Sequence, residues 1–172
     1  LETRHRWQKE TNSNEAAWQF ARACFDWADF SRDDEQRAAI AEEGIAAGRA
    51  AIRLAPKSAA GHYYLGLNLG QLAQTKMLGA LRLIDQMEAA WLKTLELDPK
   101  FDYAGGHRAL TLLYRDAPGW PTSVGNRSKA RGHLLKAIEL APNYPGNRIC
   151  WAESLLEWRE VSAVRTQLEP WR

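Results

Sequence analysis

The chain repeats one ending three times: AIRLAP at residues 51–56, TLELDP at 94–99 and AIELAP at 137–142. Successive prolines of this ending are 43 residues apart, a period typical of stacked repeats. The residues before each ending are apolar at intervals of three and four, which indicates an amphipathic helix. Because proline lacks a backbone donor and disfavours a helical residue before it, each helix is predicted to end near Pro56, Pro99 or Pro142. A second apolar pattern of the same period follows each proline, so the repeat predicts helical hairpins.

The composition also favours helix. Ala and Leu dominate the apolar residues, and the only valines are Val124, Val161 and Val164, whereas β-branched residues are typical of strands. A hairpin of this size cannot bury its own apolar face, so neighbouring hairpins are expected to stack. The predicted fold is an all-α solenoid of about four degenerate hairpin repeats within one domain, residues 1–172. The predicted units are a poorly ordered or extended lead at 1–13, then repeats at 14–56, 57–99, 100–142 and 143–172.

Helix starts are predicted from capping residues. Ser31, followed three residues later by Asp34, is a capping-box signal for a helix over 32–54. The helix before it is expected over 14–30. Ser128 is predicted to cap the closing helix of the third repeat in the same way.

Charge and composition exclude several classes of protein. The chain carries 23 Lys and Arg against 21 Asp and Glu, a formal net charge of +2, with both signs interspersed; this pattern argues against a nucleic-acid partner. Charged residues interrupt every apolar run before it reaches the ~18 residues of a membrane span. Cys24 and Cys150 lack metal-ligand spacing and are predicted to be buried, unpaired thiols.

The first helices of the hairpins resemble the W-x2-L-G-x2-Y pattern of the tetratricopeptide repeat. The frame is occupied by His62, Leu65, Gly66 and Leu69, by His107, Leu110, Thr111 and Tyr114, by Arg148, Trp151, Ala152 and Leu155, and in a degenerate copy by Trp18, Ala21, Arg22 and Phe25. The period exceeds the usual 34 residues, and the segments TKMLGALRLI and APGWPTSVGN account for the excess. Such insertions either carry binding function or only lengthen helices and turns.

Together with YLGLNLGQLAQ and AIELAPNYPGN, these two insertions make the chain similar to the T component of TRAP transporters, a family of bacterial tetratricopeptide proteins. The resemblance covers roughly residues 18–157. It implies a periplasmic, often lipid-anchored protein that associates with the substrate-binding component of the transporter and forms a homotrimer. Each of these properties is an expectation from the resemblance alone.

No catalytic or metal site is predicted. The four histidines, His5, His62, His107 and His133, form no short metal-binding motif. His62 and His107 begin helices in related frames, so packing or capping explains them. We therefore expect no enzyme activity, no metal and no cofactor.

Stacked hairpins leave a concave groove lined by their first helices, and helical spacing from the repeat frame selects its residues. The predicted ligand- or partner-binding residues are Tyr63, Leu67, Arg108, Leu112, Arg115, Trp120, Ile149 and Glu153. Apolar walls with two arginines suit a hydrophobic ligand or an organic anion, because a guanidinium offers two donors to a carboxylate. The alternative is that Arg108 and Arg115 only form a solvated face. Trp120, between two prolines, either packs its loop onto the hairpins, which we favour, or contacts a partner.

Two functions are consistent with these observations. The first is a non-enzymatic accessory protein of a TRAP-type uptake system that binds the substrate-binding component and a hydrophobic or anionic ligand. The second is a general scaffold that recognises a peptide or helix of a partner protein.

Overall fold

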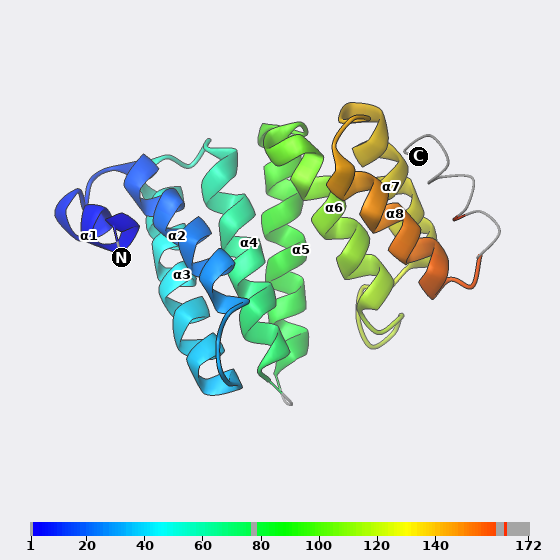
Figure 1. The fold of residues 1–172 in the computed structure, drawn as a ribbon, viewed down its shortest axis with the longest axis horizontal. Coiled ribbons are helices and arrows are strands. Elements are labelled where there is room, and N and C mark those ends of the chain that lie inside the picture. The colour runs from blue at the N-terminus through cyan, green and yellow to red at the C-terminus, as the bar shows by residue number, and fades with distance from the viewer. Residues whose placement is uncertain (1, 77–78, 161–163, 165–172) are drawn as a thin grey trace. The chain divides into compact units, whose positions relative to one another are not determined.

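A computed structural model describes residues 2–76, 79–160 and 164, and these residues form eight helices and no strand. The helices are α1 (Glu2–Lys9), α2 (Asn14–Ala28), α3 (Asp34–Leu54), α4 (Ala59–Gln74), α5 (Ala80–Leu97), α6 (Phe101–Asp116), α7 (Arg127–Leu140) and α8 (Pro145–Glu157). They belong to two compact units, Leu1–Asp98 and Pro99–Arg172 (Figure 1). The boundary between the units coincides with the end of the second predicted repeat.

The predicted hairpin corners are confirmed. Helices α3, α5 and α7 end at Leu54, Leu97 and Leu140, two residues before the prolines of the three repeated endings. Helices α2–α3, α4–α5 and α6–α7 form the hairpins, and α8 follows as the first helix of a further repeat. The prediction of an all-α fold of stacked helical hairpins is therefore confirmed. Residues 161–163 and 165–172 of the fourth predicted repeat lie outside the described residues.

Unit 1 is held together by small residues that let its helices approach closely. Helix α4 packs against α2, α3 and α5. Gly66 of α4 faces the indole of Trp91, which is buried and donates from Nε1 to the Tyr63 carbonyl at 3.3 Å. The fully buried Asn68 donates from Nδ2 to the Ala21 carbonyl of α2 and to the Tyr64 carbonyl, both at 2.8 Å. Because a buried amide needs such partners, Asn68 fixes the position of α4 against α2.

In unit 2, α7 packs against both α6 and α8. Its first helix begins with three residues in the left-handed conformation, Asp102, Tyr103 and Ala104, which costs free energy for residues other than glycine. Polar contacts hold this turn. The fully buried Asn147 donates from Nδ2 to the carbonyl oxygen of Tyr103 at 3.2 Å, and Arg108 donates to the Asp102 carboxylate at 3.0 Å.

Two predicted helix caps are wrong by two residues. The N-cap of α3 is Asp33, whose carboxylate accepts from the Gln36 amide at 2.8 Å, and the Ser31 hydroxyl has no partner among the described residues. The N-cap of α7 is Asn126, which accepts from the Lys129 amide at 2.9 Å. Ser31 lies two residues before the true cap of α3, whereas Ser128 already lies within the first turn of α7; in both cases the cap is an Asx residue with extended backbone directly before the helix.

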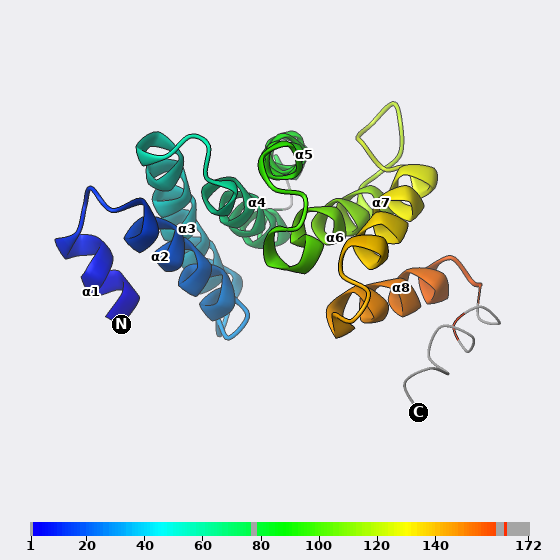
Figure 2. The same ribbon diagram turned by 90° about the horizontal axis from the view of Figure 1, so that it is seen from above.

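The lead at residues 1–13, predicted to be extended or poorly ordered, instead contains α1. This helix buries none of its residues and lies against α2 at one edge of unit 1 (Figure 2). Arg4 contacts the Glu43 carboxylate of α3, and Arg6 donates to the Gln19 side chain of α2 at 2.9 Å. Polar contacts therefore hold a helix that has no apolar periodicity.

Two remaining predictions concern single features. Cys24 and Cys150 are both buried and free, as predicted. None of the helices in the described ranges is long and apolar enough to cross a membrane.

Candidate functional site

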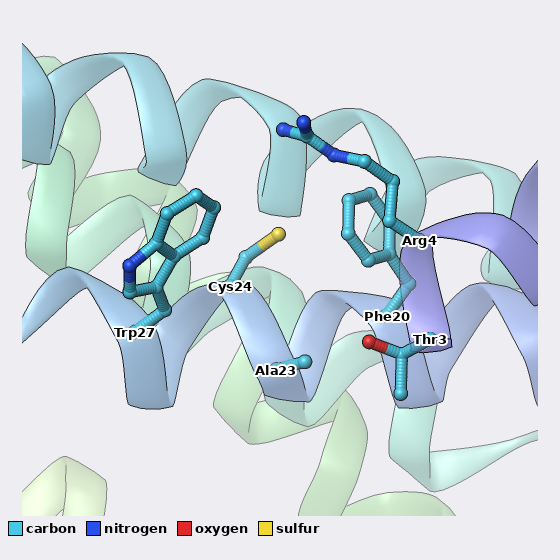
Figure 3. A pocket seen from close by; sticks show the side chains of 6 residues that line it. All are labelled: Thr3, Arg4, Phe20, Ala23, Cys24 and Trp27. Atoms are coloured by element: carbon cyan, nitrogen blue, oxygen red, sulfur yellow. The ribbon is translucent and has the colours of Figure 1, made fainter. Parts of the chain in front are cut away.

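A pocket of about 450 Å³ lies between α1 and α2 (Figure 3). It is lined by Thr3, Arg4, Phe20, Ala23, Cys24 and Trp27. Phe20 and Trp27 are seven residues apart and therefore lie on one face of α2, two turns from each other. The small side chains of Ala23 and Cys24 lie between the two rings and leave the space. Its volume and mostly apolar lining are typical of binding sites rather than of packing defects.

Arg4 of α1 covers one side of this pocket. Its guanidinium lies 5.9 Å from the ring centroids of both Phe20 and Trp27, within reach of cation–π attraction. Figure 3 shows the guanidinium above the gap between the two rings, with the Cys24 sulfur pointing into the gap. The Glu43 carboxylate binds the same guanidinium. Because Glu43 balances this charge, the pocket favours an uncharged, apolar group.

Cys24 is not suited to nucleophilic chemistry in this pocket. Burial, followed by the nearby Glu43 carboxylate, raises the pKa of its thiol to about 12. A thiol with such a pKa stays protonated at neutral pH, whereas the thiolate is the reactive form. Cys24 therefore serves as an apolar wall.

Two aromatic side chains at the end of α2 are exposed to solvent. Trp27 is 47% exposed and Phe30, just after the helix, is 82% exposed, although aromatic side chains contribute strongly to stability when they are buried. The surrounding segment, residues 26–35, contains one basic residue, Arg32, and five acidic ones: Asp26, Asp29, Asp33, Asp34 and Glu35. We call the pocket together with Trp27 and Phe30 the α2 surface; it is an apolar surface with an acidic border.

The predicted arginines of unit 2 are engaged in contacts within the chain. Arg108 donates to Asp102 and to the Asn147 oxygen, at 3.0 and 2.9 Å, and lies 4.9 Å from the Tyr144 ring centroid. Arg115 donates to the Asp116 carboxylate at 2.5 Å and to the Ser154 hydroxyl at 3.3 Å. The hydrogen bond that Arg115 donates to Asp116 raises the pKa of the guanidinium above its ordinary value. Both guanidinium groups thus connect α6 to α8.

The other predicted site residues are divided between the two units. In α4 of unit 1, Tyr63 is buried and Leu67 is half-buried. In unit 2, Leu112 of α6 is half-buried, whereas Glu153 and the 55% exposed Ile149 of α8 are accessible. The structure brings Arg115 near Glu153. The sequence analysis missed the α2 surface, although Phe20 and Trp27 were visible at helical spacing.

Trp120 does not pack its loop onto the helices, so the favoured prediction for this residue is wrong. Its side chain is 88% exposed. The loop is braced by its own backbone: the Gly125 amide donates to the Pro118 carbonyl at 2.8 Å and the Asn126 amide donates to the Tyr114 carbonyl at 2.7 Å. These contacts shape the loop without any contribution from the indole.

His107, which is buried, and His133, which is half-buried, form a pair between α6 and α7. Their Nδ1 atoms are 2.9 Å apart, so one ring donates and the other accepts. Burial, then His133 and Lys136, lowers the pKa of His107 to about 4, and burial followed by Lys129 lowers the pKa of His133. The pair is a packing contact of neutral rings, as predicted for His107. Within the described ranges no group of three or more His, Cys, Asp or Glu side chains could hold a metal ion.

The fold and the α2 surface define a helical-hairpin protein with an apolar, partly exposed aromatic site at one edge of unit 1. The chain belongs to the family described as Regulator of microtubule dynamics protein 1-3, whose model matches residues 2–105. The match contains α1 to α5 and the whole α2 surface. Trp120 and the predicted residues of α8 lie outside it. No curated protein matches this chain.

Proposed function

We propose that the chain is a non-enzymatic binding protein that docks an amphipathic helix of a partner protein on the α2 surface. The observation that carries this proposal is the pair of exposed aromatic side chains, Trp27 and Phe30, beside an apolar pocket within the family match. Trp and other aromatic residues dominate binding energy at protein interfaces. The acidic border selects a helix that carries basic residues next to its apolar stripe.

The packing of unit 1 explains why a helix fits this surface. Helix α4 is covered by α2, α3 and α5, whereas among the described elements only the eight-residue helix α1 lies against the pocket side of α2. An incoming helix would continue the stacking by which each hairpin buries its neighbour's apolar face. The family description names regulators of microtubule dynamics, so microtubules are the first partner to test.

Removing the exposed aromatic rings should weaken partner binding. We expect Trp27→Ser with Phe30→Ser to raise the concentration for half-maximal co-sedimentation with microtubules, assembled from purified tubulin, by at least about tenfold. Leu92→Ser is the matched control, because Leu92 is 45% exposed on α5 of the same unit; it should bind like the parent. Equal binding by the double variant, or no sedimentation of the parent, would contradict the proposal.

The alternative function, the T component of a TRAP transporter, stays a prediction. The following expectations also remain predictions: the periplasmic location, the lipid anchor, the substrate-binding component as partner, the homotrimer and the hydrophobic or anionic ligand. The family match supports the scaffold function instead, because its description refers to regulators and not to solute uptake.

A further inference from the structure

We propose that the chain self-associates head to tail, with the Trp120 loop of one copy inserted into the α2 surface of a second copy. The Trp120 loop is residues 117–126. This inference goes beyond the proposed function, but it uses the same α2 surface, so self-association would compete with the partner helix.

Hydrogen bonds hold the backbone of the Trp120 loop, which carries the exposed indole, in one conformation. In addition to the hydrogen bonds donated by the Gly125 and Asn126 amides, the Thr122 and Ser123 amides donate to the Gly119 carbonyl at 3.1 and 3.3 Å. A side chain at Gly125 would place its Cβ 2.1 Å from the Ala117 carbonyl oxygen, so only glycine closes the loop in this way. A preformed loop loses little conformational entropy when its exposed tryptophan is buried in a complex.

The charges beside the Trp120 loop complement those of the α2 surface. Residues 117–138 contain no acidic residue and four basic ones: Arg127, Lys129, Arg131 and Lys136. Glu139 and Glu160 form ion pairs with this group, which leaves two more basic than acidic residues. Opposite signs on two surfaces favour their encounter and suppress like-with-like pairing.

Around the α2 surface, acidic residues outnumber basic residues. Arg22, the ion-pair partner of Asp26, Arg32, and Lys76, which lines a second pocket with Asp34 and Glu35, are the basic residues to set against the five acidic residues of the segment 26–35, which leaves two more acidic than basic residues. The pocket itself is apolar, and Glu43 balances its guanidinium. An uncharged indole entering between Phe20 and Trp27 therefore meets aromatic walls, while the flanking charges of the two copies attract each other.

Such a contact joins two different surfaces and is heterologous, so each copy keeps one free surface of each kind and can add further copies. Sedimentation velocity of the purified full chain tests this. The parent should show a weight-average mass that rises with protein concentration, and high salt should weaken the association by at least about tenfold, because the flanking attraction is screened.

Two variants separate the two surfaces. Trp120→Ser removes the inserted ring and keeps the α2 surface, whereas Ala23→Trp fills the pocket and keeps the loop. Each variant alone should remain a monomer, and an equimolar mixture should form a dimer and nothing larger, since only one productive contact remains. Leu156→Ser, at an exposed apolar residue of α8, should associate like the parent.

Three results of these sedimentation experiments would overturn the inference. These are a parent that stays monomeric at all concentrations, a Trp120→Ser variant that associates like the parent, and a mixture that stays monomeric. Failure here is distinct from failure of the proposed function, because Trp120→Ser leaves the α2 surface intact for co-sedimentation with microtubules. Loss of microtubule binding in Trp27→Ser with Phe30→Ser can therefore be observed whether or not the chain self-associates.

Discussion

Gly66→Ala is expected to lower the free energy of unfolding by about 3 kcal/mol, the cost of overpacking a core that cannot relax. A Cβ at this position would lie 2.3 Å from Nε1 and 2.7 Å from Cε2 of Trp91. The indole is buried and hydrogen-bonded to the Tyr63 carbonyl, so it cannot move without losing that hydrogen bond. Chemical denaturation followed by circular dichroism measures the change.

Gly70→Ala is the control for this substitution, in the same helix. Its Cβ would meet only the terminal methyl of Met87 at 3.4 Å, and alanine is about 0.5–1 kcal/mol better than glycine within a helix. We expect Gly70→Ala to be neutral or stabilising. Trp91→Phe should recover part of the loss when combined with Gly66→Ala, because the smaller ring leaves space for the new methyl. Equal destabilisation by both glycine variants would show that contact with Trp91 does not limit the packing.

Acidification is expected to remove on the order of 2 kcal/mol of stability between about pH 6.5 and pH 4, through His107. In the unfolded chain this histidine takes up a proton near pH 6.5, whereas burial lowers its folded pKa to about 4. The unfolded state therefore binds more protons in this window, and stability falls as the pH falls. It is fully present above pH 6.5.

The pH dependence is measured by repeating denaturation across this window for the parent and for His107→Phe. The variant should show a shallower slope of stability against pH, whatever its absolute stability. Lys129, Lys136 and Glu139 also face the pair and stay unchanged in the variant. An unchanged slope in His107→Phe would contradict the assignment of the effect to this residue.

The hairpin corners could be predicted from the sequence because proline acts locally. A helix cannot continue through Pro56, Pro99 or Pro142, because proline lacks the backbone donor and disfavours helical backbone at the residue before it. The caps were less certain. Ser31 and Asp33 can both accept from the first turn, and the extended backbone at Asp33 decides between them. That conformation depends on how the loop crosses from α2 to α3, which a local pattern does not contain.

The α2 surface could not be predicted from periodicity alone. Phe20 and Trp27 have the spacing of core residues, and only the placement of α1 determines which of them stays accessible. That placement depends on the contact of Arg4 with Glu43, 39 positions away in the chain. The same limit applies to Arg108. Its position in the repeat placed it in the predicted groove, but in the structure its guanidinium binds the carboxylate of Asp102 in the left-handed turn.

The proposed role of the α2 surface is tested most directly by hydroxyl-radical footprinting of the chain bound to microtubules, in the Trp120→Ser background so that self-association does not protect the same residues. Oxidation at Trp27 and Phe30, read by mass spectrometry, should fall at least about fivefold on binding, as for side chains that become buried at the centre of an interface. Leu92, exposed on α5, should remain equally oxidised. Unchanged oxidation of Trp27 and Phe30 in the bound chain would contradict the account.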